Sequence, residues 1–331
     1  MKNILEISAL KTGYCRENPV PGHPFTAMTE EGLLTAVIGK NGAGKTTLLK
    51  TLCGLLPALD GKIMINTREI GTMTHIEKAR MISYIMPNTG MIPDIRVKDV
   101  VSMGRFPYTG WFKPGQPQDH NACNEAIAQA GIEHLCEKQF HQLSEGEKQR
   151  VLFAMALAQN TPFMLFDEPA AFLDIPARNH IYDLMYRLTR KNHKSVIFTT
   201  HDIRRAMASC DMMWVFTPGE IIAGMPEELG INGVLDQVFQ DDHLVFNNGL
   251  MDYTPATNTK GPAVEVIGSG SVFEWTFALI QRLGFYPQCN ITAPISVIVD
   301  ETGKQWHIRS EKFTGSFFSC TEFAQQMKNL I

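Results

Sequence analysis

Apolar residues along the chain fall in short runs that alternate with stretches of helical spacing. The runs predict buried strands at residues 33–39, 63–65, 81–86, 163–166 and 196–199. Helical spacing follows from Lys45, between Asp94 and about His141 around a Pro/Gly-rich loop at 107–117, and over residues 177–190. Strands that alternate with helices predict a mostly parallel, doubly wound α/β sheet.

The pattern changes towards the end of the chain. Residues 213–217 and 220–223 predict a strand pair that turns at Pro218-Gly219. Residues 252–262, rich in Thr, Pro, Asn and Gly, predict a linker. Strands at 264–267, 296–299 and 306–308 and helices at 271–283 and about 318–327 follow, and Ser271 and Glu274 have the spacing of a capping box. We therefore expect a main domain over 1–251, a linker at 252–262 and a small accessory α+β domain over 263–331.

Composition narrows the functional class only slightly. The 331 residues suffice for one large domain with a small second one, and the net charge of −4 gives no basic excess that would indicate nucleic acid. Seven scattered cysteines without a Cys-x-x-Cys pair favour a reducing compartment over a disulfide framework or a zinc site. Glu6 interrupts any signal-like apolar run, and we expect no membrane span. A role in transport would need another chain to form the channel.

The segment after the strand at 33–39 has the G-x-x-x-x-G-K-[ST] spacing of a phosphate-binding loop. It consists of Gly39, Lys40, Asn41, Gly42, Ala43, Gly44, Lys45 and Thr46. The glycines let the backbone N–H groups point at phosphates, and the following helix N-terminus favours negative charge. Lys45 is expected to reach the β- and γ-phosphates, and Thr46 to offer its hydroxyl to Mg²⁺.

Two carboxylates, Asp167 and Glu168, come directly after the apolar strand at 163–166. Ligands bind at the carboxyl ends of strands in a doubly wound sheet. Asp167 is therefore a candidate to hold Mg²⁺, directly or through water. Glu168 is a candidate to orient and deprotonate an attacking water.

A third segment reads Leu143-Ser144-Glu145-Gly146-Glu147. Ser144 and Glu147 form a capping box at a helix start. The spacing alone favours an ordinary capped helix, although the helix N-terminus, the Ser144 hydroxyl and Gly146 also have the makings of an anion site.

This third segment resembles the LSGGQ signature of ATP-binding cassette (ABC) ATPases. The order of phosphate loop, signature and Asp-Glu strand also matches that family. The resemblance covers about residues 1–250. It implies a P-loop NTPase core of the ABC type with a helical subdomain at about 88–155, and hydrolysis of ATP with Mg²⁺ as cofactor.

The resemblance also implies roles for single residues. Phe172-Leu173-Asp174 resembles the D-loop, and Thr199-Thr200-His201 resembles the motif whose histidine contacts the γ-phosphate. Gly13-Tyr14 is similar to the aromatic loop on which adenine stacks, and Thr47 joins the nucleotide-binding set. In a head-to-tail dimer with a second copy, Ser144, Gly146 and Glu147 would cover the ATP bound by the partner.

A subfamily pattern is present in residues 97–108, VKDVVSMGRFPY. It is similar to the TVxELVxxGRxPY pattern of importers for iron–siderophore complexes, haem and vitamin B12. The resemblance implies separate permease subunits, an external solute-binding protein, and a peripheral position on the cytoplasmic face of the inner membrane.

Two departures from the family leave alternatives open. The family has Gln after the strand at 82–86, where this chain has Pro87-Asn88, so a hydrolysis-impaired binding module is one alternative; Glu168 and His201 argue against it. Glu145 stands where Gly is usual, and we expect its carboxylate to face solvent.

A non-transport ABC ATPase, of the iron–sulfur assembly type, is the other alternative, and residues 97–108 argue against it. For residues 255–331 we expect a small regulatory or dimer-stabilising domain, with ligand sensing as the alternative.

Overall fold

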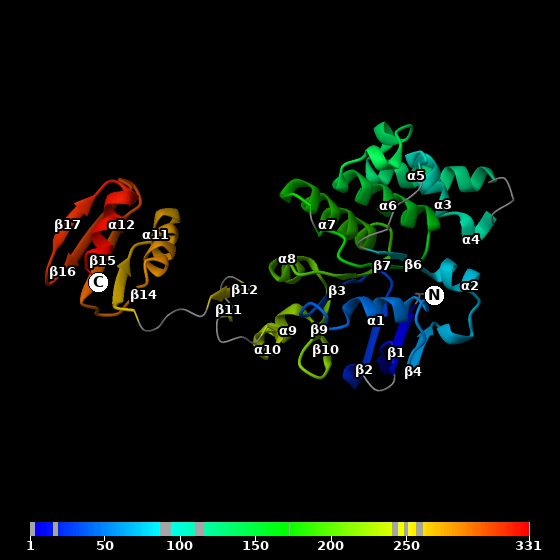
Figure 1. Cartoon of the computed structure of the whole chain (residues 1–331), viewed down its shortest axis with the longest axis horizontal. Helices are drawn as coiled ribbons and strands as arrows, with labels where there is room; N and C mark the ends of the chain where they lie inside the picture. The colour runs from blue at the N-terminus through cyan, green and yellow to red at the C-terminus, as the bar shows by residue number, and fades with distance from the viewer. Residues whose placement is uncertain are drawn as a thin grey trace. The chain divides into compact units, whose positions relative to one another are not determined.

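The computed structural model describes residues 4–15, 19–86, 94–109, 116–171, 173–239, 244–247, 251–255 and 261–330. The chain forms two compact units (Figure 1). The first contains Met1–Asp241 and Phe246–Tyr253, and the second contains Asp242–Val245 and Thr254–Ile331. The second unit has a hydrophobic core of its own.

A six-stranded sheet with the order β10-β9-β3-β8-β7-β6 lies at the centre of the first unit. The parallel strands are β3 (Leu34–Ile38), β6 (Ile82–Ile85), β7 (Phe163–Phe166), β8 (Ser195–Thr199) and β9 (Met212–Phe216). β10 (Ile221–Gly224) pairs antiparallel with β9, as the predicted strand pair requires. Every residue of β3, β7 and β8 is buried, which explains their mainly apolar sequences. The predicted α/β class is confirmed.

A second, antiparallel sheet has the order β2-β1-β4-β5. Its strands are β1 (Ile4–Thr12), β2 (Val20–Glu30), β4 (Asp60–Ile65) and β5 (Arg68–Glu69). Helix α1 (Lys45–Leu52) contributes Leu48 and Leu49 to a core that it shares with both sheets. The sequence pattern did not predict β1 and β2. Pro21, Gly22 and Pro24 in β2 are unusual within strands, and the register of β1 shifts near Ala9, whose φ is 49°.

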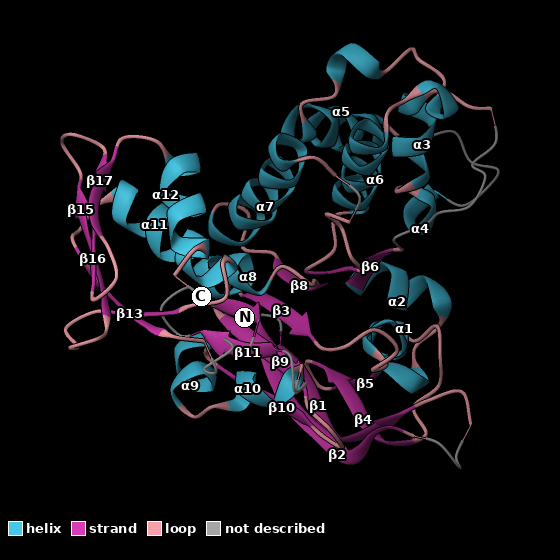
Figure 2. Ribbon diagram, turned by 60° about the vertical axis from the view of Figure 1, so that its left-hand side comes forward, coloured by secondary structure: helices cyan, strands magenta, loops and turns pink. Residues whose placement is uncertain are grey.

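Helices make up the rest of the first unit. They are α2 (His75–Met81), α3 (Val97–Met103), α4 (Phe106–Thr109), α5 (Pro117–Ala130), α6 (Glu145–Gln159), α7 (Ile175–Arg190), α8 (Ile203–Ser209), α9 (Pro226–Ile231) and α10 (Val234–Val238). Short 3-10 turns lie at Ile70–Thr72, Glu133–Leu135 and Phe140–Gln142. Figure 2 shows α3, α4, α5 and α6 gathered on one side of the strands. Helices α3, α5 and α6 pack against one another and α4 packs against α2, which produces the helical subdomain that the fold class includes.

The first residues of the predicted linker form a strand instead. β12 (Asp252–Pro255) pairs with β11 (Leu244–Asn247). The ring of Tyr253 lies 4.9 Å from that of Phe239 and 5.2 Å from that of Phe246, and its hydroxyl donates to the carbonyl of Leu235. The surrounding Thr and Pro residues concealed this single aromatic anchor. Residues 256–260 of the predicted linker lie outside the described residues.

The second unit is an α+β fold with the sheet order β14-β13-β15-β16-β17. Its elements are β13 (Ala263–Ile267), α11 (Ser271–Arg282), β14 (Tyr286–Gln288), β15 (Ile295–Asp300), β16 (Gln305–Ser310), β17 (Thr314–Phe317) and α12 (Cys320–Lys328). β13 runs parallel to both of its neighbours, and β15, β16 and β17 form an antiparallel meander. β14 and β17 were missed because they are only three and four residues long.

The predicted capping box at Ser271 and Glu274 is wrong. The N-cap of α11 is Gly270, and a carboxylate from another loop occupies the helix start. Glu301 Oε1 accepts from the backbone N–H and the hydroxyl of Ser271, both at 3.0 Å, and Oε2 accepts from the N–H of Val272 at 2.9 Å. A helix start needs acceptors for its N–H groups, and a distant residue supplies them here.

Candidate active site

The phosphate loop connects β3 to α1, as predicted. Gly44 is the N-cap of α1, with a φ of 101°, and Gly42 has a φ of 77°. A Cβ atom on Gly44 would lie 2.2 Å from Cγ1 of Val20. Both the left-handed backbone and the close contact therefore require glycine at position 44.

Lys45 is buried at the base of this loop. Its Nζ donates to the carbonyl oxygens of Gly39 at 2.8 Å and Lys40 at 3.1 Å. Burial lowers the pKa of the Lys45 ammonium, while the carboxylates of Glu168 and Asp167 act in the opposite direction. An ammonium has three donors, so the loop carbonyls leave one for a phosphate oxygen.

Asp167 and Glu168 follow β7. Thr199 is the last residue of β8, and Thr200 and His201 follow it. Phe166 pairs with Phe198 in parallel register, so the two segments leave the sheet at the same edge. The buried hydroxyl of Thr199 donates to Oδ1 of Asp167 at 2.7 Å and accepts from the backbone N–H of Glu168 at 2.7 Å. One threonine therefore fixes both acidic residues.

Asp167 has a second partner on the other neighbouring strand. Its side chain is 1% exposed, and the hydroxyl of Tyr84 on β6 donates to Oδ2 at 3.4 Å. Burial, reinforced by the charge of Asp167, raises the pKa of Tyr84, which keeps the phenol protonated and able to donate.

Glu168 has a φ of 49°, which is uncommon outside glycine and is a form of backbone strain found at functional sites. Its Oε1 lies 2.8 Å from Nε2 of His201. Both side chains remain partly exposed, 30% for Glu168 and 40% for His201. They line a cleft of about 380 Å³ together with Ala170, Ala171, Arg178, Tyr182, Thr199, Thr200, Asp202, Ile203 and Asp252.

The signature segment is a capped helix start. Ser144 is the N-cap of α6; its hydroxyl donates to Oε2 of Glu147 at 2.8 Å and accepts from the Glu147 N–H at 3.3 Å. The predicted capping box is therefore correct. Glu145 points to solvent as expected and pairs with Lys148 at 2.7 Å. A Cβ atom on Gly146 would lie 3.3 Å from Cβ of Ala177, so this glycine packs closely against α7.

The remaining predicted residues lie in varied settings. Asp174 is the N-cap of α7 and accepts from the N–H of Ala177 at 2.9 Å. Tyr14 is 73% exposed, Thr46 is half-buried and Thr47 is buried. Phe172 and the Pro87-Asn88 departure lie outside the described residues.

Sequence reasoning missed two side chains of this site, Tyr84 and the bridging hydroxyl of Thr199. Only the Thr199-Thr200-His201 resemblance gave a signal for Thr199, and nothing in the sequence singled out Tyr84. Among the described residues, no group of three or more His, Cys, Asp or Glu side chains is arranged to hold a metal ion.

The family model described as ABC transporter matches residues 23–171. The achromobactin transport ATP-binding protein CbrD of Dickeya dadantii is 36% identical over 214 residues, which cover 64% of this chain and 79% of the relative. This chain belongs to the ABC transporter family of ATP-binding proteins. The ABC ATPase is also 32% identical over 216 residues to the ferric enterobactin transport ATP-binding protein FepC of Escherichia coli, covering 65% of this chain and 80% of that protein.

A solved structure supports the same fold for the ABC ATPase. CbiO1 of Clostridium perfringens, part of the ABC transporter complex cbiONQ, has a TM-score of 0.61 and 26% identity, covering 71% of this chain and 93% of its own. The chain is thus an ATP-binding, ATP-hydrolysing ABC ATPase. No helix within the described ranges of this ABC ATPase is long and apolar enough to span a bilayer.

Proposed function

We propose that this chain drives the uptake of an iron complex, either a siderophore or haem, or of cobalamin, through separate permease subunits. The relatives named above carry achromobactin and ferric enterobactin transport in their names, and residues 97–108 have the importer pattern. The subunit would act at the cytoplasmic face of the inner membrane, with substrate delivered by an external solute-binding protein.

In the proposed reaction, Glu168 is the general base and His201 orients it. The 2.8 Å contact between these two side chains, beside the buried Lys45 and Asp167, is the observation that carries the proposal. A general base needs a fixed carboxylate that water can reach, and Glu168 is both hydrogen-bonded and partly exposed. Lys45 and the amides of Gly39 to Thr47 would bind the phosphates, and Tyr14 would stack on adenine.

The side chains present fit Mg²⁺, with Thr46 and Asp167 as the proposed protein ligands. Asp167 is held by hydroxyl donors on two neighbouring strands, which fix the orientation of its carboxylate. Mg²⁺ prefers oxygen ligands and usually takes only one or two from the protein, with waters and phosphate oxygens completing its shell. When bound, the ion neutralises charge on the phosphates.

We also infer that two copies pair head to tail. Ser144 and Glu147 lie at the start of α6, where the exposed capping hydroxyl faces solvent. A helix start with N–H donors suits an anion, so this end of α6, with Gly146, would cover the ATP bound by the partner. Asp174 caps α7 next to this segment and would belong to the same interface.

The test is Glu168→Gln in the full chain. We expect ATP binding to persist while Mg²⁺-dependent turnover falls about 10²–10⁴-fold, the usual size of a general-base contribution. Glu125→Gln, on the exposed side of α5, is the matched control and should turn over normally. Turnover is measured with and without the membrane protein that co-purifies. Near-normal turnover in Glu168→Gln would reject the assignment.

A further inference from the structure

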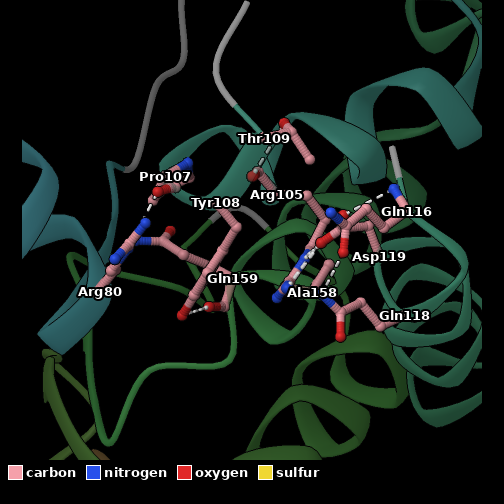
Figure 3. A network of polar contacts seen from close by, with 10 residues as sticks. All are labelled: Arg80, Arg105, Pro107, Tyr108, Thr109, Gln116, Gln118, Asp119, Ala158 and Gln159. Carbon is pink, nitrogen blue, oxygen red and sulfur yellow. Dashed lines mark hydrogen bonds and ion pairs between the residues drawn. The ribbon is translucent and has the colours of Figure 1, made fainter. Parts of the chain in front are cut away.

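Arg105 and Tyr108 lie against the C-terminal end of α6 (Figure 3). The last carbonyl groups of a helix have no partner within the helix and attract cations and donors. Arg105 Nη1 donates to the carbonyl of Ala158 at 2.8 Å, and the Tyr108 hydroxyl donates to the carbonyl of Gln159 at 3.0 Å. The side chains of Tyr108 in α4 and of Arg105 just before it therefore cap α6.

Arg105 is itself held rigidly. Its guanidinium bonds Oδ1 of Asp119 at 2.9 Å, and both side chains are largely buried, 12% and 7% exposed. The ring of Tyr108 lies 4.0 Å from the Arg105 guanidinium carbon. A cation that is buried, paired and stacked keeps one geometry, so the cap on α6 has little freedom.

Pro107, Tyr108 and Gln159 also contact α2 and β6, and β6 belongs to the same sheet as β3, which precedes the phosphate loop. Arg80 of α2 donates to the carbonyl of Pro107 at 3.1 Å and lies 5.2 Å from the ring centre of Tyr108. The side-chain amide of Gln159 donates to the carbonyls of Ala79 at 2.6 Å and Ile82 at 3.2 Å. The end of α6 is thus tied both to α4 and to the junction of α2 with β6.

Helix α6 connects these contacts at its C-terminal end to the signature segment at its N-terminal end. Its 15 residues span about 22 Å at 1.5 Å per residue, with Ser144 at one end and Gln159 at the other. In the middle, the ring of Phe153 lies 4.3 Å from that of Phe166 on β7. A rigid helix that is supported in its middle turns its N-terminal end whenever its C-terminal end moves.

We propose that Arg105, Tyr108 and the Gln159 side chain are positioning residues that set the orientation of Ser144 through α6. The inference rests on the proposed role of Ser144 in covering the ATP of a second copy. Gly104 fits the same scheme, because a Cβ atom there would lie 2.2 Å from the carbonyl oxygen of Met155 on α6. These contacts at the end of α6 affect how Ser144 covers the ATP of a second copy. They do not affect the binding of ATP to a single copy.

The test compares Tyr108→Phe and Gln159→Met with wild type in the full chain. Tyr108→Phe keeps the ring over both arginines and removes only the bond to α6; Gln159→Met keeps the length of the side chain and removes its amide donors. We expect kcat to fall about three- to ten-fold, the effect of one net hydrogen bond, with the KM and single-copy affinity for ATP within about two-fold. Tyr186→Phe is the matched control, since Tyr186 also stacks on an arginine, Arg190 at 5.2 Å, but on α7.

Two results would overturn the inference: kcat within about two-fold of wild type in both variants, or parallel losses of kcat and ATP affinity, which indicate general damage. The proposed function fails separately, if wild type lacks turnover or Glu168→Gln keeps it. In that case ATP-dependent self-association, measured by sedimentation velocity, still tests the inference. Tyr108→Phe and Gln159→Met must associate more weakly than Tyr186→Phe, and equal association rejects the positioning role.

Discussion

Thr199→Val tests the connection between β8 and the two acidic residues. The substitution keeps the branched shape of the side chain and removes one hydroxyl, which bridges Asp167 Oδ1 and the N–H of Glu168 at 2.7 Å each. Thr199 is 0% exposed, so water has no direct route to replace the lost group. The variant therefore isolates two hydrogen bonds at the centre of the candidate site.

The expected loss follows from these two bonds. A hydrogen bond to a charged group contributes about 1.5–3 kcal/mol and a neutral one about 1 kcal/mol, so we expect the free energy of unfolding to fall by about 2.5–4 kcal/mol. Glu168 has a strained backbone, and its N–H would lose the acceptor that helps to hold that conformation. We expect kcat to fall at least about ten-fold, because a misplaced base loses its alignment with water.

The assay combines urea unfolding of the first unit, hydrogen exchange of the Glu168 amide, and turnover. Thr35→Val is the matched control: Thr35 lies on β3, is 0% exposed, and its hydroxyl is without a hydrogen-bond partner among the described residues. We expect Thr35→Val to be neutral or slightly stabilising, since burying an unpaired hydroxyl is costly. Equal stability and equal Glu168 exchange in the two variants would refute the bridging role of Thr199.

Two further variants test the loop and the signature helix. Gly44→Ala should weaken ATP binding more than about ten-fold in a fluorescent-nucleotide titration, because its φ of 101° and the 2.2 Å approach to Val20 exclude a methyl group without strain; unchanged affinity would contradict this. Hydrogen bonds from the Ser144 backbone and hydroxyl lower the pKa of Glu147, so its contribution to stability is present above the ordinary glutamate value of about 4.3 and disappears as the pH falls through the lowered pKa. Glu147→Gln should remove that acid-dependent part of an unfolding titration, and a profile identical to wild type would exclude it.

The sequence predicted those parts of the site that depend on neighbouring residues. The phosphate loop, the Ser144 capping box and the strand before Asp167 are each written within a few positions, and the structure contains all three. Parallel strands that are buried on both faces leave uninterrupted apolar runs, so the central sheet was also predictable.

The missed features depend on residues far apart in the chain. Tyr84 reaches Asp167 only because β6 and β7 pair, and Glu301 reaches Ser271 only because two loops meet at the start of α11. No local pattern encodes either meeting. Tyr253 shows the converse failure: its sequence neighbours are typical of a linker, yet a single ring packed between Phe239 and Phe246 fixes a strand.

The carboxylate of Glu301 competes with any free phosphate for the N–H groups at the start of α11. A glycine turn before a helix ordinarily offers its N–H groups to a phosphate. Here any phosphate must displace a tethered carboxylate, and tethered groups act at effective concentrations of about millimolar or more. A Cβ atom on Gly270 would lie 2.7 Å from the Glu301 carboxyl carbon, so the glycine serves the internal carboxylate. A free phosphate thus meets a helix start in the second unit that the protein's own carboxylate already occupies.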